Sequence, residues 1–150
     1  MAILKILQTG DATLRKISEP VTAFDLNLAT LLNDMKDTLE DAKGAGLAAV
    51  QVGVLKRVFI VSVEEGYYEF VNPKILGTSG SQYGAEGCLS VKGKWGDVKR
   101  PRKVTVEAQD RYGNKFKVVA RDFFAKAICH EYDHLDGILY TDKADNLRDE

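Results

Sequence analysis

The apolar positions in the first third of the chain repeat with a helical period. Leucine and methionine recur at intervals of three or four residues, at Leu28, Leu31, Leu32, Met35 and Leu39. Such spacing places the side chains on one face of an α-helix. Asp25 is a suitable N-cap, and Gly44 follows the end of the pattern. The pattern therefore predicts a helix between Asp25 and Gly44 that packs one face against the core.

The middle of the chain is rich in β-branched and aromatic residues separated by short turns. Residues 58–63 and 68–71 predict two strands joined by a turn, and residues 104–108 and 116–119 predict a second pair joined at 112–114. Because both connections are short, each pair is expected to be an antiparallel hairpin.

A second helix is predicted from Asp122, as its N-cap, to a stop at Gly137. Its apolar and functional residues occupy most of the helix circumference, which indicates a buried helix. The order of elements predicts an α+β fold, with antiparallel β-sheets packed around a buried, metal-binding C-terminal helix and with an N-terminal helix. At 150 residues, the whole chain (1–150) is expected to form a single domain.

Composition and charge exclude several classes of protein. Hydrophobic residues make up 45% and charged residues 29%, as in ordinary globular proteins, and the net charge of −1 argues against a DNA-binding module. The N-terminal apolar stretch is too short for a signal peptide or a membrane span, so we expect a cytoplasmic protein. One local basic run is interpreted as a solvated loop and strand edge: Lys92, Lys94, Lys99, Arg100, Arg102 and Lys103.

The strongest chemical signal is the H-E-x-x-H pattern that begins at His130. His130 and His134 are four residues apart, so on a helix their imidazoles project from one face and can share a metal ion. Glu131, at roughly 100° around the helix, can reach a metal-bound water without being a ligand. The competing interpretation treats all three as ordinary helix residues.

A catalytic metal site usually has three protein ligands and one open position. The extended protease pattern would require histidine at Tyr140, and the one glutamate after His134 is Glu150, so neither common protease form fits. Cys88 is the remaining soft donor outside the helix, and thiolates bind zinc, iron and cobalt well. Cys129 is interpreted as a small buried hydrophobe. A disulfide between these cysteines is disfavoured in a reducing compartment.

Three segments together resemble the peptide deformylase family. Residues 44–51 match G-x-G-L-A-A-x-Q, residues 86–90 match E-G-C-L-S, and residues 130–134 match H-E-x-D-H. The three motifs also follow one another in the family's order and separation, and the resemblance extends from Leu14 to Asp142.

The resemblance implies a metallohydrolase that removes the formyl group from the N-terminal formyl-methionine of nascent polypeptides, a step of N-terminal processing in protein biosynthesis. It implies three metal ligands: Cys88, His130 and His134. Glu131 is then the general acid/base on a metal-bound water, and Gln51 with the backbone N–H of Leu89 binds the oxyanion. Fe²⁺ is the expected native ion, and Zn²⁺, Ni²⁺ or Co²⁺ can occupy a purified sample. The enzyme is expected to be a monomer that works near the ribosome.

Several residues in or near these motifs are candidates for substrate binding: Ala45, Gly46, Gly87, Phe123 and Ala127. Gly44 and Gly46 would let an extended peptide pair with the chain, whereas the remaining apolar candidates line a methionine pocket or belong to the core. Without its motif, Gln51 would be interpreted as a surface glutamine.

The chain departs from the family pattern at Lys92, where many members have proline, and it resembles the shorter bacterial form in ending soon after Asp142. Arg100 either pairs with Glu86 to hold the cysteine loop or is a solvated strand charge. Two alternatives remain for the function. One is a metal-dependent amidase or peptidase with another acyl specificity, and the other is a structural metal site in a binding protein.

Overall fold

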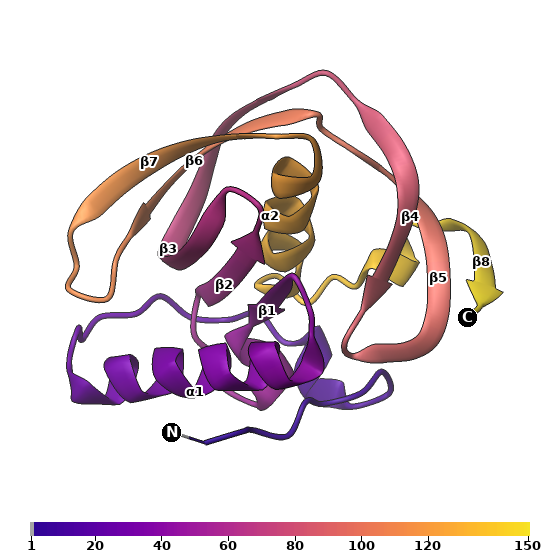
Figure 1. Ribbon diagram of the computed structural model, residues 1–150. Coiled ribbons are helices and arrows are strands. Elements are labelled where there is room, and N and C mark those ends of the chain that lie inside the picture. Colours follow the sequence, from indigo (N-terminus) through magenta and orange to yellow (C-terminus); the bar gives the residue numbers. More distant parts are fainter. Residues whose placement is uncertain (1) are drawn as a thin grey trace.

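The computed structural model describes residues 2–150 and contains two α-helices and two antiparallel sheets (Figure 1). The helices are α1 (Leu26–Ala42) and α2 (Asp122–His134). The strands are β1 (Gly46–Ala48), β2 (Val58–Val63), β3 (Gly66–Ser79), β4 (Gln82–Cys88), β5 (Val91–Arg100), β6 (Lys103–Gln109), β7 (Lys115–Arg121) and β8 (Asp145–Asp149). Among the described helices, none is long and apolar enough to cross a membrane.

The larger sheet has the order β1-β2-β3-β6-β7, and the smaller sheet has the order β4-β5-β8. Both predicted hairpins are present, as β2 with β3 and β6 with β7. The strands β3 and β6 continue into β4 and β5, so the chain passes from one sheet to the other as a bent ribbon, at the top of Figure 1. This ribbon carries the smaller sheet to the side of α2.

Helix α1 begins as the sequence predicts. The Asp25 carboxylate accepts a hydrogen bond from the Leu28 N–H at 3.1 Å and so caps the first turn. At the other end, Lys43 rather than Gly44 takes the left-handed conformation, with φ 56°. The apolar face of α1 packs against residues from β1 and β2, including Leu47 and Ile60.

Helix α2 lies between the two sheets (Figure 1) and is buried along most of its length, as predicted. The predicted N-cap is wrong, because the capping position is Arg121. Asp122 has φ 55°, and its carboxylate pairs with Arg102 at 3.0 Å instead of capping the helix. The helix ends at His134, before a turn that reaches Gly137 at φ 74°. The α+β prediction is confirmed, with a short 3-10 helix and β8 following α2.

The sequence patterns did not predict the strands of the smaller sheet. Its strand β5 includes most of the basic run, which is largely exposed as expected, but Arg100 is only 3% exposed. The solvated interpretation is therefore wrong for Arg100. Strand β8 is exposed throughout and pairs with β5 through its backbone.

Candidate metal centre and its cavity

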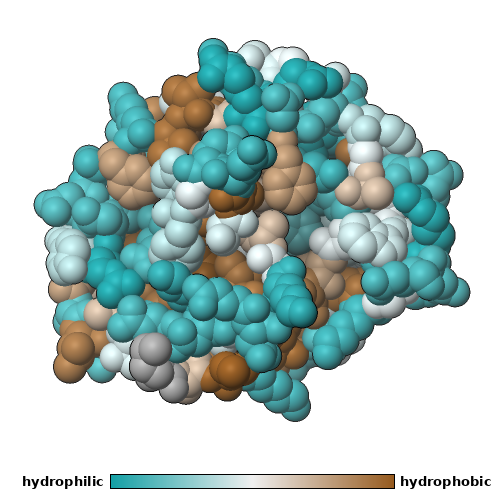
Figure 2. All heavy atoms as spheres, viewed as in Figure 1, coloured by the Kyte–Doolittle hydropathy of each residue, from teal (hydrophilic) through white to brown (hydrophobic). Residues whose placement is uncertain are grey.

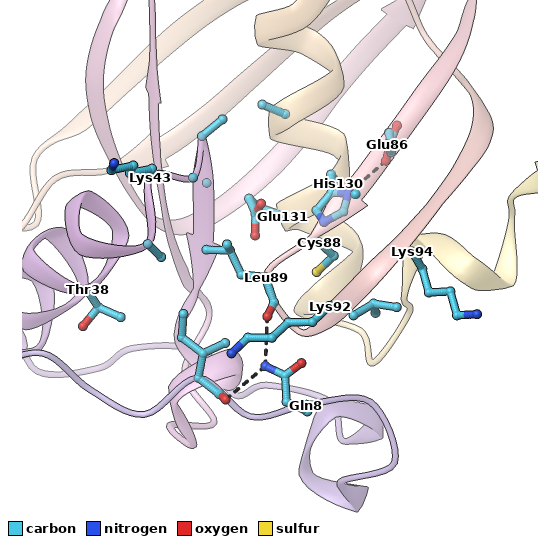
Figure 3. Close-up of a pocket in the computed structure, with 18 of the residues that line it drawn as sticks. Gln8, Thr38, Lys43, Glu86, Cys88, Leu89, Lys92, Lys94, His130 and Glu131 are labelled. Atoms are coloured by element: carbon cyan, nitrogen blue, oxygen red, sulfur yellow. Dashed lines mark hydrogen bonds and ion pairs between the residues drawn. The ribbon is translucent and has the colours of Figure 1, made fainter. Parts of the chain in front are cut away.

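Three potential metal ligands converge between α2 and the end of β4. The donor atoms of Cys88, His130 and His134 all lie within 4.8 Å of one another. The Cys88 Sγ is 3.4 Å from His134 Nε2. Figure 3 shows His130 and Glu131 projecting from α2 toward the same space as Cys88. The structure thus brings together the three residues that the sequence proposes as ligands.

A buried ion pair fixes the orientation of His130. The Glu86 carboxylate lies 2.9 Å from His130 Nδ1, which leaves Nε2 for a metal ion. Arg100 donates two hydrogen bonds to Glu86, at 2.9 and 3.0 Å, and a third to Asp133 at 2.7 Å. Burial acts to raise the pKa of Glu86, but the hydrogen bonds from His130 and Arg100 lower it to about 2. Glu86 is therefore a carboxylate at neutral pH.

The two histidines differ in their electrostatic surroundings. Burial, reinforced by the neighbouring His130, lowers the pKa of His134 well below its usual range, so this imidazole is neutral. Burial also acts to lower the pKa of His130, but Cys88 and Glu86 raise it to about 10. Metal binding at His130 would release that proton, as is usual when ligands with bound protons coordinate a cation.

Glu131 stands directly over Gly46 of β1. A Cβ on Gly46 would lie 2.5 Å from Glu131 Oε2, so only glycine leaves room for this carboxylate. Glu131 is 4% exposed, and its Oε1 has no hydrogen-bond partner among residues 2–150. Burial raises the pKa of Glu131 to about 7, with His130 acting in the opposite direction. A carboxyl group of this kind can both accept and donate a proton near neutral pH.

Gln51 is buried, so its interpretation as a surface glutamine is wrong. Its Oε1 accepts a hydrogen bond from the Ala48 N–H at 2.9 Å, which orients the amide. Its Nε2 then donates to Ser90 Oγ at 3.0 Å and lies 3.6 Å from Cys88 Sγ. The amide donor is thus held beside the candidate metal centre.

A cavity of about 1030 Å³ opens in front of these residues. Figure 2 shows this face hollowed, with apolar surface inside a largely hydrophilic rim. Seven of the residues that the sequence proposes for substrate binding or catalysis line this cavity: Ala45, Gly46, Gly87, Leu89, Phe123, Ala127 and Glu131. Cys88 and His130 also line it, whereas His134 and Gln51 lie behind the wall. All five substrate-binding candidates therefore face one cavity.

Two supporting residues escaped the sequence analysis. Ser90 accepts the hydrogen bond of Gln51, and its place in the E-G-C-L-S motif was a usable signal. Gln8 donates to the Leu89 carbonyl at 2.9 Å and so holds the turn between β4 and β5 (Figure 3). Nothing in the sequence around Gln8 points to that contact.

Cys129 is buried at 7% exposure, and burial raises the pKa of its thiol to about 11. It packs in the core cluster of α2, as its interpretation as a small hydrophobe predicts. Both cysteines are free thiols.

Comparisons of the sequence and of the structure with known proteins identify the same family. The model of the polypeptide deformylase family matches residues 3–150. A peptide deformylase of Caldicellulosiruptor bescii is 54% identical over 143 residues, which are 95% of this chain and 86% of that protein. The crystal structure of a peptide deformylase from Legionella pneumophila superposes with a TM-score of 0.93 at 43% identity, covering 97% of this chain and 88% of the other. A peptide deformylase from Synechococcus elongatus, solved in complex with actinonin, has a TM-score of 0.92 at 37% identity, covering 95% of this chain and 79% of the other.

Proposed function

The chain belongs to the peptide deformylase family, a family of metal-dependent hydrolases that act on formylated nascent peptides, and we propose how its own residues carry out the reaction. In this proposal residues 1–150 form one catalytic domain that hydrolyses the formyl group of N-terminal formyl-methionine. The observation that carries the proposal is that the donor atoms of Cys88, His130 and His134 lie together at the wall of the cavity that Glu131 also lines.

The donor set fits a single divalent cation. One thiolate and two imidazoles suit Fe²⁺, Zn²⁺, Co²⁺ and Ni²⁺, and three protein ligands leave a position for the reacting water. Cys88, His130 and His134 would hold the cation, which would supply Lewis acidity and so lower the pKa of the reacting water from about 15.7 toward 7. We propose Fe²⁺ as the native ion, with Zn²⁺, Ni²⁺ or Co²⁺ able to replace it in a purified sample.

Glu131 acts as the general base and then as the general acid in this mechanism. Its carboxylate accepts a proton from the attacking water, whose oxygen forms the new bond to the formyl carbon. The same group then delivers the proton to the departing amine as the carbon–nitrogen bond breaks, so that formate and a free N-terminus are released. Proton transfer by a positioned carboxylate typically contributes about 10²–10⁴-fold to the rate.

Two N–H donors stabilise the negative charge that develops on the formyl oxygen. Gln51 is supported in this role by the fixed orientation of its amide beside Cys88. The second donor is the backbone N–H of Leu89, in the turn that Gln8 holds from the other side. Loss of one such donor typically costs about 3–4 kcal/mol of transition-state stabilisation.

The substrate peptide is proposed to extend along β1. This strand is at the edge of its sheet, and the residues around it, from Gly44 to Gly46, line the cavity. An extended peptide can add to such an edge through main-chain hydrogen bonds. The methionine side chain then enters the part of the cavity formed by Ala45, Phe123 and Ala127, and Gly87 lies on the wall formed by the smaller sheet.

The test is hydrolysis of formyl-Met-Ala-Ser by protein purified without oxygen, with metal analysis of the same sample. We expect release of formate, and loss of activity together with iron on exposure to air. Equal rates on formyl-Met and acetyl-Met peptides would favour an amidase of different specificity. Glu131→Gln should keep the metal and lose at least about 100-fold in kcat. Full turnover by that variant would favour a structural metal site.

The complex of the Synechococcus elongatus relative offers a direct binding test. We expect actinonin to bind the cavity of this chain and raise its melting temperature, because a ligand that binds only the folded state stabilises it. Under the same proposal the enzyme acts as a monomer in the cytoplasm, on chains emerging from the ribosome. Sedimentation of the purified protein checks the oligomeric state.

A further inference from the structure

The wall of the cavity on the smaller sheet contains an irregular segment. The pairing of β4 with β5 passes from Glu86↔Gly96 directly to Cys88↔Val91. Between these two pairs β4 has one residue, Gly87, whereas β5 has four, residues 92–95. None of these four residues has a Cα partner on β4. We call residues 92–95 the 92–95 bulge. Bulges re-aim side chains and occur often beside active sites.

The 92–95 bulge places the indole of Trp95 against Gly87. A Cβ on Gly87 would lie 3.1 Å from Cζ3 of Trp95 and 3.3 Å from both Cε3 and Cη2. The indole thus rests on a residue without a side chain, immediately before the candidate ligand Cys88. Trp95 lines the cavity and remains 38% exposed, so part of the indole is open to a ligand in the cavity.

The neighbours of Trp95 leave its exposed surface accessible from the cavity. Lys94 is held away by an ion pair with Asp149 at 2.5 Å, and Figure 3 shows its side chain pointing away from Cys88. Lys92 extends beside Leu89 instead, and within residues 2–150 it makes no ion pair. Trp95 therefore presents an aromatic surface on the cavity wall that the smaller sheet forms.

We propose that Trp95 is a specificity-determining residue that binds the side chain following the formyl-methionine, and that it favours apolar and aromatic residues there. The inference rests on the proposed function and extends it. A peptide aligned on β1 with its formyl group at the metal centre runs out of the cavity between β1 and Gly87. Successive side chains of an extended peptide point to opposite faces, so the side chain after methionine points away from the methionine pocket. In this alignment it meets the indole, because Gly87 itself offers no side chain. Aromatic side chains provide large contact areas at low entropic cost.

The first experiment measures binding. Trp95 is the one tryptophan of the chain, so the tryptophan emission of the protein reports on this site alone. Metal-loaded Glu131→Gln protein is titrated with formyl-Met-Leu-Ser and formyl-Met-Gly-Ser, and calorimetry follows binding independently. We expect a saturable change of emission and tighter binding of the leucine peptide. Binding seen by calorimetry without any change of emission would overturn the proposal.

The second experiment measures hydrolysis of formyl-Met-X-Ser with X as Gly, Ser, Leu or Phe. We expect Trp95→Ala to raise KM about ten-fold for X as Leu or Phe, equivalent to about 1.4 kcal/mol. KM for X as Gly and kcat for all peptides should change less than about two-fold, and Trp95→Phe should restore most of the preference. Tyr112→Ala is the control, because Tyr112 is 77% exposed and lies outside the cavity.

A loss of equal size for every X, or no loss for Leu and Phe, would overturn the role of Trp95. The proposed function is judged separately, by turnover of formyl-Met-Gly-Ser by the unmodified enzyme. If that peptide is cleaved without any dependence on X, only the inference about Trp95 fails. If no formyl peptide is cleaved, the proposed function fails, and the emission titration alone then decides whether Trp95 contacts a bound peptide.

Discussion

A methyl group added at Gly46 would collide with Glu131. The new Cβ would lie 2.5 Å from Oε2 and 2.9 Å from both Cδ and Cγ of Glu131. Ordinary carbon contacts begin near 3.5 Å, so the carboxylate must move by about 1 Å if β1 stays paired with β2. A misplacement of that size typically costs about 100-fold in rate. We therefore expect Gly46→Ala to reduce kcat about 100-fold, or about 2.7 kcal/mol.

The assay compares kcat for formyl-Met-Ala-Ser with the metal content and melting temperature of the same sample. Gly77→Ala is the matched control, since Gly77 is also a strand glycine and no atom lies within 4 Å of the position that its Cβ would take. The control should keep kcat, and both variants should keep the metal. Wild-type kcat in Gly46→Ala would refute the reasoning, as would a loss of activity no larger than the loss of metal.

Three further predictions concern stability. Arg100→Met leaves the buried Glu86 carboxylate without its main partner and should lower the free energy of unfolding by about 3–5 kcal/mol, measured in urea. Adding Glu86→Gln should recover part of this lost stability, and no recovery would contradict this account. Gly137→Ala combines φ 74° with a Cβ that would collide with the Arg15 carbonyl oxygen and should cost about 3 kcal/mol. Gly53→Ala has φ 86° but open space and should cost only about 1–2 kcal/mol, so equal losses would be inconsistent with the steric argument. Removing the metal with a chelator should lower the melting temperature reversibly, because only the folded chain assembles the donors, and an unchanged value would argue against a bound ion.

The elements that the sequence predicts well are those with one buried face. Helix α1 and the two hairpins have apolar periods that match their secondary structure, and the structure confirms them. The H-E-x-x-H pattern also needs only a helix to bring His130 and His134 together. The assignment of metal ligands and catalytic groups stays a prediction, but the structure places those residues within reach of one another.

The elements that the sequence misses depend on tertiary contacts. Strands β4 and β5 have no regular alternation, because glycines and the 92–95 bulge interrupt it. No residue of strand β8 is buried, and the strand is held by its pairing with β5. Asp122 has the composition of an N-cap, but its positive φ and its pairing with Arg102 remove it from that role. A local sequence pattern carries no information about these long-range partners.

The burial of Arg100 has a consequence for how the candidate metal centre is assembled. Cys88 comes from the smaller sheet, whereas His130 and His134 come from α2, so the donors meet only if that sheet docks correctly on the helix. Arg100, on the smaller sheet, joins the two parts by binding Glu86 of its own sheet and Asp133 of α2. A buried ion pair by itself adds little to stability, and apolar side chains of similar volume often serve as well. Here the charged groups also fix the His130 ring through Glu86, which apolar replacements would not do. The same contacts that dock the sheet thus orient a candidate metal ligand, and this dual role accounts for a buried arginine where packing alone would favour an apolar residue.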